Sequence, residues 1–196
     1  MTARSARRES KAAPNDIVVR ELRWSDYPSL REMYYLLYEE REAFPEVGIT
    51  LFEARPTDDD EVAWFQGLYR RALSGESIVA VAERDGLIVG HCTVSSVGRT
   101  TSAENAHVGE LGILVHRDHR ASGVGRALLE RTLSQCRRKF EIVRLTVFSV
   151  NARARRLYEE FGFAYVGTVP RAIRRGVRYF DEDLMYLELA RKDANR

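Results

Sequence analysis

A short glycine-containing turn in the second half of the chain has the residue types of an anion-binding loop. It consists of Arg120, Ala121, Ser122, Gly123, Val124, Gly125 and Arg126. Glycines let the backbone approach a bulky group closely, and a helix that starts here points its first free amides at that group. Arginines add fixed positive charge. The turn predicts a pyrophosphate site, and glycines that serve only a tight turn are the alternative.

Two common phosphate-binding loops do not fit this turn. A P-loop requires Gly-x-x-x-x-Gly-Lys followed by Ser or Thr, and the chain contains no such string. A dinucleotide-binding fingerprint requires a small residue where the chain has Leu128. Another kind of phosphate loop is therefore expected.

A second segment, residues 151–163, follows an apolar strand and begins with Asn151. By itself its helical stripe is typical of a core face, and Gly162 is typical of a helix end. Taken together, the two segments resemble the two signatures of the GCN5-related N-acetyltransferase (GNAT) superfamily. These are Arg/Gln-x-x-Gly-x-Gly/Ala and Asn-x-x-Ala-x-x-Leu-Tyr-x-x-x-Gly-Phe. The resemblance covers about residues 17–190.

This resemblance implies a cosubstrate, acetyl-CoA, and a role for each matching residue. Residues 120–126 would bind its pyrophosphate, and Asn151 would contact the pantetheine arm. Tyr158 would face the thioester sulfur and protonate the departing thiolate. The strand residues that would pair with the pantetheine amides are Ile113, Leu114 and Val115.

Glu110 is the candidate base that removes a proton from the acceptor ammonium. Relatives place a carboxylate three residues before the pantetheine-binding strand segment. Its neighbours Val108, Gly109 and Leu111 are weakly polar, a setting that would raise its pKa. An ion-paired carboxylate at a strand edge is the alternative, and His107 is a second candidate base.

Several other charged or ligating residues allow a structural interpretation as well as a functional one. His116 and His119 have no third ligand nearby, so we expect surface histidines and no metal site. Residues 39–61 carry an excess of acidic residues that could attract a cationic amine. The alternative is that these acids lie at solvated helix ends. The cluster of Arg171, Arg174, Arg175 and Arg178 could bind an acceptor carboxylate or the adenosine 3′-phosphate, or form an exposed loop.

Composition narrows the class of protein further. The chain has 196 residues, 44% of them hydrophobic and 31% charged, as in ordinary globular domains. It has no apolar run of membrane-spanning length, and its net charge of +2 gives no reason to expect nucleic acid. Only two cysteines, Cys92 and Cys136, are present, which excludes a disulfide framework and favours the cytoplasm.

The elements that must position these residues alternate in the order βααβββαβαββ. Strands are expected near 17–22, 77–83, 87–97, 107–115, 141–148, 163–171 and 178–189, and helices near 25–41, 57–73, 123–139 and 151–161. This pattern predicts one mixed α/β sheet. The resemblance implies the GNAT fold: a mostly antiparallel sheet, helices on both faces, and a bulged central strand that splays from its neighbour.

The expected organisation is one N-acetyltransferase domain at 17–190 between a flexible basic tail at 1–16 and a short tail at 191–196. The resemblance implies acetyl transfer to a small primary amine or a peptide amino terminus, and is compatible with a homodimer. A catalytically silent acyl-CoA-binding module of the same fold stays open as the alternative. Gly123, Gly125, Asn151 and Tyr158 favour the enzyme.

Overall fold

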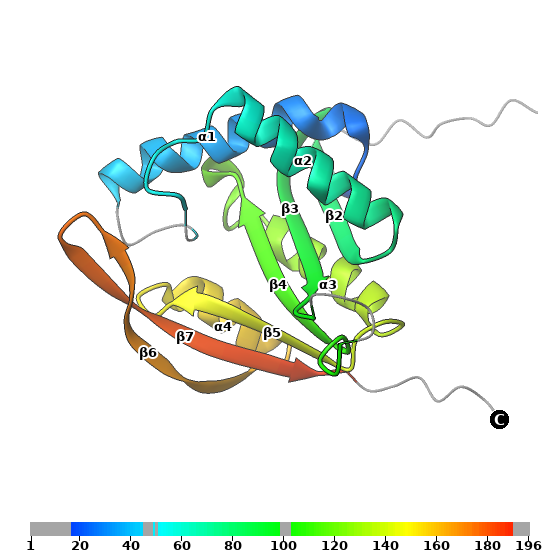
Figure 1. Ribbon diagram of the computed structural model, residues 1–196, viewed down its shortest axis with the longest axis vertical. Helices are drawn as coiled ribbons and strands as arrows, with labels where there is room; N and C mark the ends of the chain where they lie inside the picture. Colours follow the sequence, from blue (N-terminus) through cyan, green and yellow to red (C-terminus); the bar gives the residue numbers. More distant parts are fainter. Residues whose placement is uncertain (1–16, 45–48, 50, 99–102, 190–196) are drawn as a thin grey trace, which may run out of the picture.

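The computed structural model describes residues 17–44, 49, 51–98 and 103–189. Strands alternate with helices in the expected order (Figure 1). The strands are β1 (Val18–Glu21), β2 (Ser77–Arg84), β3 (Leu87–Ser96), β4 (Val108–Val115), β5 (Ile142–Phe148), β6 (Ala164–Arg175) and β7 (Arg178–Glu188). The helices are α1 (Tyr27–Ala43), α2 (Asp58–Leu73), α3 (Val124–Cys136) and α4 (Ala152–Glu160), with short 3-10 turns at Trp24–Asp26 and Arg117–His119. Both expected tails lie outside the described residues.

All seven strands form one sheet in the order β1-β2-β3-β4-β5-β7-β6. Every neighbouring pair is antiparallel except β4 and β5, which run parallel. The mixed, mostly antiparallel sheet expected from the sequence is therefore confirmed. The turn at Asp85-Gly86 joins β2 to β3, and both residues have positive φ, as a two-residue hairpin turn requires.

Helices cover both faces of the sheet, and each face has its own apolar core. Leu30 and Met33 from α1 and Phe65 and Leu68 from α2 pack with Val81 on one face. On the other face, buried residues of α3 and α4 pack on the strands; they include Leu128, Leu129, Cys136 and Tyr158. Strand side chains alternate between faces, so the residues of β4 are divided between the two cores.

The centre of the sheet opens between β4 and β5. Only three residue pairs connect these strands, of which Glu110 with Arg144 is the last. Beyond that pair β4 stays with β3 and β5 stays with β7, so the two halves of the sheet diverge. The splayed central pair is confirmed. The expected bulge in β4 is not present, because its register with β3 is unbroken from Gly109 to Val115.

Gly109 and Gly112 do different things in this strand. A Cβ on Gly109 would lie 2.5 Å from Val94 and 3.1 Å from Phe140, so glycine permits the close packing at the closed end. A Cβ on Gly112 would meet no atom within 4 Å, because this residue faces the gap. Gly109 therefore permits tight packing at the closed end of the strand pair, and Gly112 leaves open space at the gap.

The last hairpin is longer than the sequence predicted. Residues 172–175 continue β6, and only Gly176 and Val177 separate it from β7. The register of this hairpin shifts between Val169 and Ile173, where Arg171 adopts a positive φ and its amide donates to Asp181. The strand therefore continues through a bulge past its expected end at residue 171.

Candidate active site

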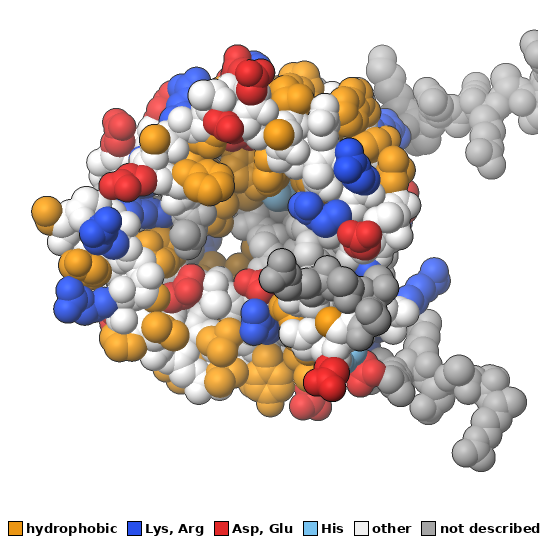
Figure 2. Space-filling view, viewed as in Figure 1, with side chains coloured by type: hydrophobic (Ala, Val, Ile, Leu, Met, Phe, Trp, Pro, Cys, Tyr) orange, Lys and Arg blue, Asp and Glu red, His pale blue; other side chains and the backbone are white. Residues whose placement is uncertain are grey.

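A cleft of about 1190 Å³ follows the opening between β4 and β5. Its walls come from α1, α2 and β3 on one side, from β4 in the middle, and from the start of α3, β5 and α4 on the other. Figure 2 shows the surface hollowed between the part that carries α1 and α2 and the part that carries β5 to β7. The site residues that line it are Glu110, Ile113, Leu114, Val115, Arg120, Ala121, Gly123, Gly125, Arg126, Asn151 and Tyr158.

The turn before α3 has the backbone of an anion loop. Ala121 and Gly123 have φ of 62° and 89°, and Gly123 is the N-cap of α3. Because a helix leaves its first amides without backbone acceptors, those of Val124, Gly125 and Arg126 are free for a ligand at this end of the cleft. A Cβ on Gly125 would lie 3.3 Å from Leu157, so this glycine brings α3 against α4.

Two residues of the turn do not line the cleft. Ser122 donates from its hydroxyl to the carbonyl of His119 at 2.7 Å, and Val124 is buried in the core. Both residues were predicted to bind the cofactor, but their side chains have structural roles. Of these two residues, only the backbone amides could contact an anion bound at the turn.

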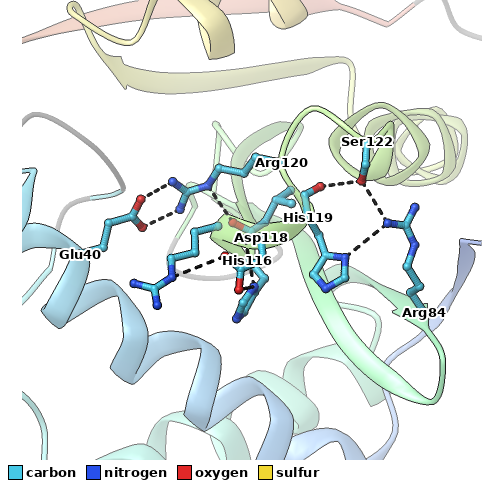
Figure 3. A network of polar contacts seen from close by, with 9 residues as sticks. Glu40, Arg84, His116, Asp118, His119, Arg120 and Ser122 are labelled. Carbon is cyan, nitrogen blue, oxygen red and sulfur yellow. Dashed lines mark hydrogen bonds and ion pairs between the residues drawn. The ribbon is translucent and has the colours of Figure 1, made fainter. Parts of the chain in front are cut away.

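Arg120 is held by a carboxylate from a distant part of the chain. Its guanidinium makes a two-point ion pair with Glu40 of α1, in which Nη2 donates to Oε2 at 2.7 Å, and its Nε donates to the carbonyl of Val115 at 3.1 Å (Figure 3). The positive charge expected to serve phosphate is balanced by Glu40. Arg126, the other arginine of the turn, pairs with Glu160 and lies over the ring of Phe161.

His116 and His119 belong to a polar network beside the turn. Arg84 donates to Nδ1 of His119 and to the hydroxyl of Ser122, both at 3.3 Å, and the amide of Asp118 donates to Nδ1 of His116 (Figure 3). Within the described ranges no group of three or more His, Cys, Asp or Glu side chains could hold a metal ion. These histidines stabilise the loop.

Tyr158 is a buried side chain that lines the cleft, together with residues of β4 and β5. Its side chain is 6% exposed, its ring packs 5.8 Å from that of Phe163, and it lines the cleft. Burial raises its pKa above the ordinary value of 10, so the phenol stays protonated at neutral pH. No described residue forms a hydrogen bond with its hydroxyl, which leaves that group available to a ligand.

Glu110 lines the cleft in a setting that differs from the expected one. Its side chain is 51% exposed, and it accepts a hydrogen bond of 2.9 Å from Arg144 of β5. The weakly polar surroundings inferred from its neighbours are wrong, because the side chain points away from them and across the sheet to β5. The ion-paired carboxylate left open as the alternative is present. His107 is exposed and does not line the cleft.

The remaining predicted cofactor residues, Asn151 and Ile113 to Val115, line the cleft. Asn151 caps α4, with its side-chain oxygen accepting from the amide of Ala154 at 3.1 Å, and it lines the cleft. Ile113, Leu114 and Val115 form the part of β4 that has no pairing with β5. Their backbone on that edge is available to an extended ligand with amide groups.

Three side chains of the opposite wall were not predicted from the sequence. The hydroxyl of Tyr34 lies 2.9 Å from Nε2 of His91, and the rings of Tyr34 and Trp64 meet edge to face at 4.6 Å. Burial lowers the pKa of His91 to about 4, so its imidazole is neutral at pH 7. Neither the helical spacing of Tyr34 nor the adjacency of His91 and Cys92 in the sequence indicated this cluster, because its members come from three different elements.

The two charged clusters singled out in the sequence do not form the acceptor wall. Among the described acids of residues 39–61, Glu40 alone lines the cleft, and it is paired with Arg120. None of the four hairpin arginines lines it: Arg171 lies 4.1 Å over the ring of Tyr179, and Arg175 lies over Phe148 and donates to the carbonyl of Ile49. The proposed attraction of a cationic amine by this acidic stretch is therefore not supported.

These features fit acetyl-CoA, a long molecule with an anionic centre and a thioester end. The cleft is lined by the start of α3 with its free amides, by an edge of β4 that has no pairing with β5, and by Tyr158, whose hydroxyl has no hydrogen-bond partner among the described residues. Pyrophosphate, pantetheine amides and a thioester are groups that such features can bind.

Sequence comparison gives the family. The model of the acetyltransferase (GNAT) family matches residues 19–163. The L-amino acid N-acetyltransferase AaaT of Escherichia coli is 29% identical over 170 residues, which covers 85% of this chain and 94% of the relative. The L-amino acid N-acyltransferase MnaT of the same organism is 29% identical over 133 residues, 67% of this chain and 73% of the relative.

Solved structures show the same fold. A Salmonella typhimurium acetyltransferase determined with acetyl-CoA superposes with a TM-score of 0.75 at 23% identity, covering 93% of this chain and 99% of that one. The ribosomal-protein-alanine N-acetyltransferase of Brucella melitensis superposes with a TM-score of 0.74 at 25% identity, covering 88% and 99%. The described residues contain no helix that is long and apolar enough to cross a membrane. This chain belongs to the GNAT family and is an acetyl-CoA-dependent N-acetyltransferase.

Proposed function

We propose that the acceptor is a free amino acid, acetylated on its α-amino group. The observation that carries this is Arg71, a cation on the acceptor side of the cleft. It follows Trp64 and Leu68 on the face of α2 that lines the cleft, and it has no ion pair with any described residue. A guanidinium is suited to bind a carboxylate through two parallel hydrogen bonds. The names of the curated relatives, which are amino acid acyltransferases, support the same class.

The proposed chemistry has two proton transfers, one on each side of the gap between β4 and β5. Acetyl-CoA supplies an activated acetyl thioester when bound. Glu110, facing α1 and α2 from β4, accepts the proton that the acceptor ammonium must lose before attack, directly or through water. A backbone amide on the unpaired edge of β4 stabilises the developing oxyanion. Tyr158, protonated at neutral pH, donates to the departing sulfur.

The wall of Tyr34, Trp64 and His91 would then contact the acceptor's side chain. It presents aromatic surface with a neutral imidazole already hydrogen bonded to a phenol. Such a surface accepts apolar or polarisable groups without adding charge. Arg71 lies on α2 with Trp64, and the proposed base Glu110 lies on β4, so an α-amino acid offers its carboxylate to Arg71, its amino group to Glu110 and its side chain to the aromatic surface.

The experiment compares amino acids with their carboxamides as acceptors. For the wild-type enzyme we expect kcat/KM to fall at least about tenfold when the carboxylate is replaced, since a charged partner is lost. Arg71→Ala should lower kcat/KM for the acid by a similar factor and leave that for the amide unchanged. Arg70→Ala is the control, because Arg70 is exposed on the same helix and does not line the cleft.

Other outcomes identify the alternatives. Faster acetylation of short peptides than of amino acids would favour a peptide amino terminus. Acetyl-CoA binding without turnover of any amine would favour the silent acyl-CoA-binding module. The two buried free cysteines support a reducing location, and we propose the cytoplasm.

A further inference from the structure

The outer end of the cleft carries an unusual group of arginines on α4. Arg153 and Arg156 line the cleft there, together with Arg126 of α3. The first turn of α4 contains no acidic residue, although the positive end of a helix dipole favours acids and disfavours cations. Arg153, in this first turn, is therefore unfavourable for the helix unless an anion compensates its charge.

Few carboxylates are available to these arginines. Glu160 is shared, pairing with Arg126 and lying 3.5 Å from Nε of Arg156, whose side chain is 82% exposed. Arg153 has no ion pair with any described residue. Three guanidiniums thus face one carboxylate, which leaves an excess of two positive charges at this rim.

We propose that Arg153 and Arg156 form the subsite for the 3′-phosphate of the adenosine moiety of coenzyme A. The inference rests on the placement of the thioester end at Tyr158 proposed above. With the thioester at Tyr158 and the pyrophosphate at the start of α3, the adenosine end must leave the cleft past α3 and α4. A terminal phosphate monoester carries about −1.5 to −2 charges at pH 7, and this rim has cations without partners to receive it.

The other basic groups of the structure do not fit this role. Arg84 and His119 bond to each other and lie outside the cleft lining. At the β6–β7 hairpin, Arg171, Arg175 and Arg178 lie over aromatic rings, and neither they nor Arg174 line the cleft. Arg120 is neutralised by Glu40.

Binding of coenzyme A and of 3′-dephospho-coenzyme A, measured by calorimetry, tests the proposal. The two ligands differ only in the phosphate in question. We expect the wild-type enzyme to bind coenzyme A about tenfold more tightly, as for exposed charge-assisted hydrogen bonds. In the double variant Arg153→Ala/Arg156→Ala that ratio should fall below about threefold, through weaker binding of coenzyme A only. Alanine is a good helix former, so α4 is retained.

The matched control removes the same charge elsewhere. Arg131 and Arg138 are exposed on or just after α3 and do not line the cleft, so Arg131→Ala/Arg138→Ala should keep the wild-type ratio. Glu160→Gln should raise the affinity for coenzyme A, because it removes the carboxylate that competes for the rim.

Several results would overturn the subsite. They are equal binding of both ligands by the wild-type enzyme, an unchanged ratio in the double variant, or an equal loss for both ligands, which would place the arginines on the pyrophosphate instead. The amino acid proposal fails separately, through acceptor kinetics, and does not affect this ratio.

Discussion

The carboxylate of Glu40 and the guanidinium of Arg120 join α1 to the anion loop across eighty positions of sequence. Both side chains are largely buried, with 10% and 26% exposed. Because Arg120 also bonds to the carbonyl of Val115, the pair fixes the end of β4 and the turn relative to the acceptor-side helix. Glu40 is therefore a positioning residue that relates the cofactor wall to the acceptor wall.

Glu40→Gln should destabilise the fold and weaken acetyl-CoA binding, because it leaves Arg120 charged without its partner. We expect a loss of about 1–3 kcal/mol in the free energy of unfolding, measured by urea denaturation. In a double-mutant cycle with Arg120→Gln, the two losses should be strongly non-additive. Additive losses would show that the pair is not energetically coupled.

Gly123→Glu should abolish tight acetyl-CoA binding by placing a negative charge where the pyrophosphate binds. Since Gly123 has a φ of 89°, any side chain there also introduces strain. Gly123→Gln carries the same strain without the charge and is the control. We expect calorimetry to show at least tenfold weaker binding by the Glu variant than by the Gln variant. Equal affinities would place the pyrophosphate elsewhere.

Tyr158→Phe should lower kcat by about 10²–10⁴-fold if acid catalysis is the whole effect, while acetyl-CoA still binds. The hydroxyl has no hydrogen-bond partner among the described residues, so its removal should cost little stability. Tyr165→Phe, which changes an exposed tyrosine, should leave kcat unchanged. A Tyr158→Phe enzyme with wild-type turnover would remove the phenol from the reaction.

Glu110→Gln should slow turnover near neutral pH, and the defect should shrink as pH rises because more acceptor amine is then already neutral. The ascending limb of the pH–rate profile should therefore move to higher pH. Arg144→Ala separates the two roles of this carboxylate, since it breaks the ion pair and keeps the candidate base. If the Glu110→Gln profile ran parallel to the wild-type profile at every pH, the carboxylate would be only an ion-pair partner.

Acidification should destabilise the fold through His91. Its pKa is about 4 in the folded chain, below the ordinary 6.5, so the unfolded chain binds a proton that the folded chain does not. Stability is therefore fully present above pH 6.5 and is lost as pH falls toward 4. From pH 7 to 5 this loss is about 2 kcal/mol.

The His91→Gln variant should lose less stability over the same pH range, because glutamine keeps hydrogen-bonding capacity and does not titrate. Denaturant unfolding at both pH values gives the comparison. His107→Gln, at an exposed position, should behave as the wild type. Identical pH dependence in all three proteins would assign acid sensitivity to other groups.

The sequence by itself determined the order of the elements, the anion loop and the buried tyrosine. Helix and strand periodicity are local properties, and the positive φ of Gly123 and the cap formed by Asn151 depend on adjacent residues. Such features can be predicted from residue spacing because the residues that interact lie within one helical turn of each other along the chain. The longer last hairpin was missed because the bulge at Arg171, through which β6 continues to Arg175, depends on pairing with β7.

Only the tertiary structure decided which charges are free. Arg120 looked like a phosphate ligand until folding brought Glu40 beside it, and Glu110 looked shielded until the short pairing of β4 with β5 placed Arg144 opposite. The wall of Tyr34, Trp64 and His91 is assembled from two helices and a strand. Which residues far apart in sequence become ion-pair partners depends on how the two halves of the sheet diverge. No local sequence pattern encodes this divergence.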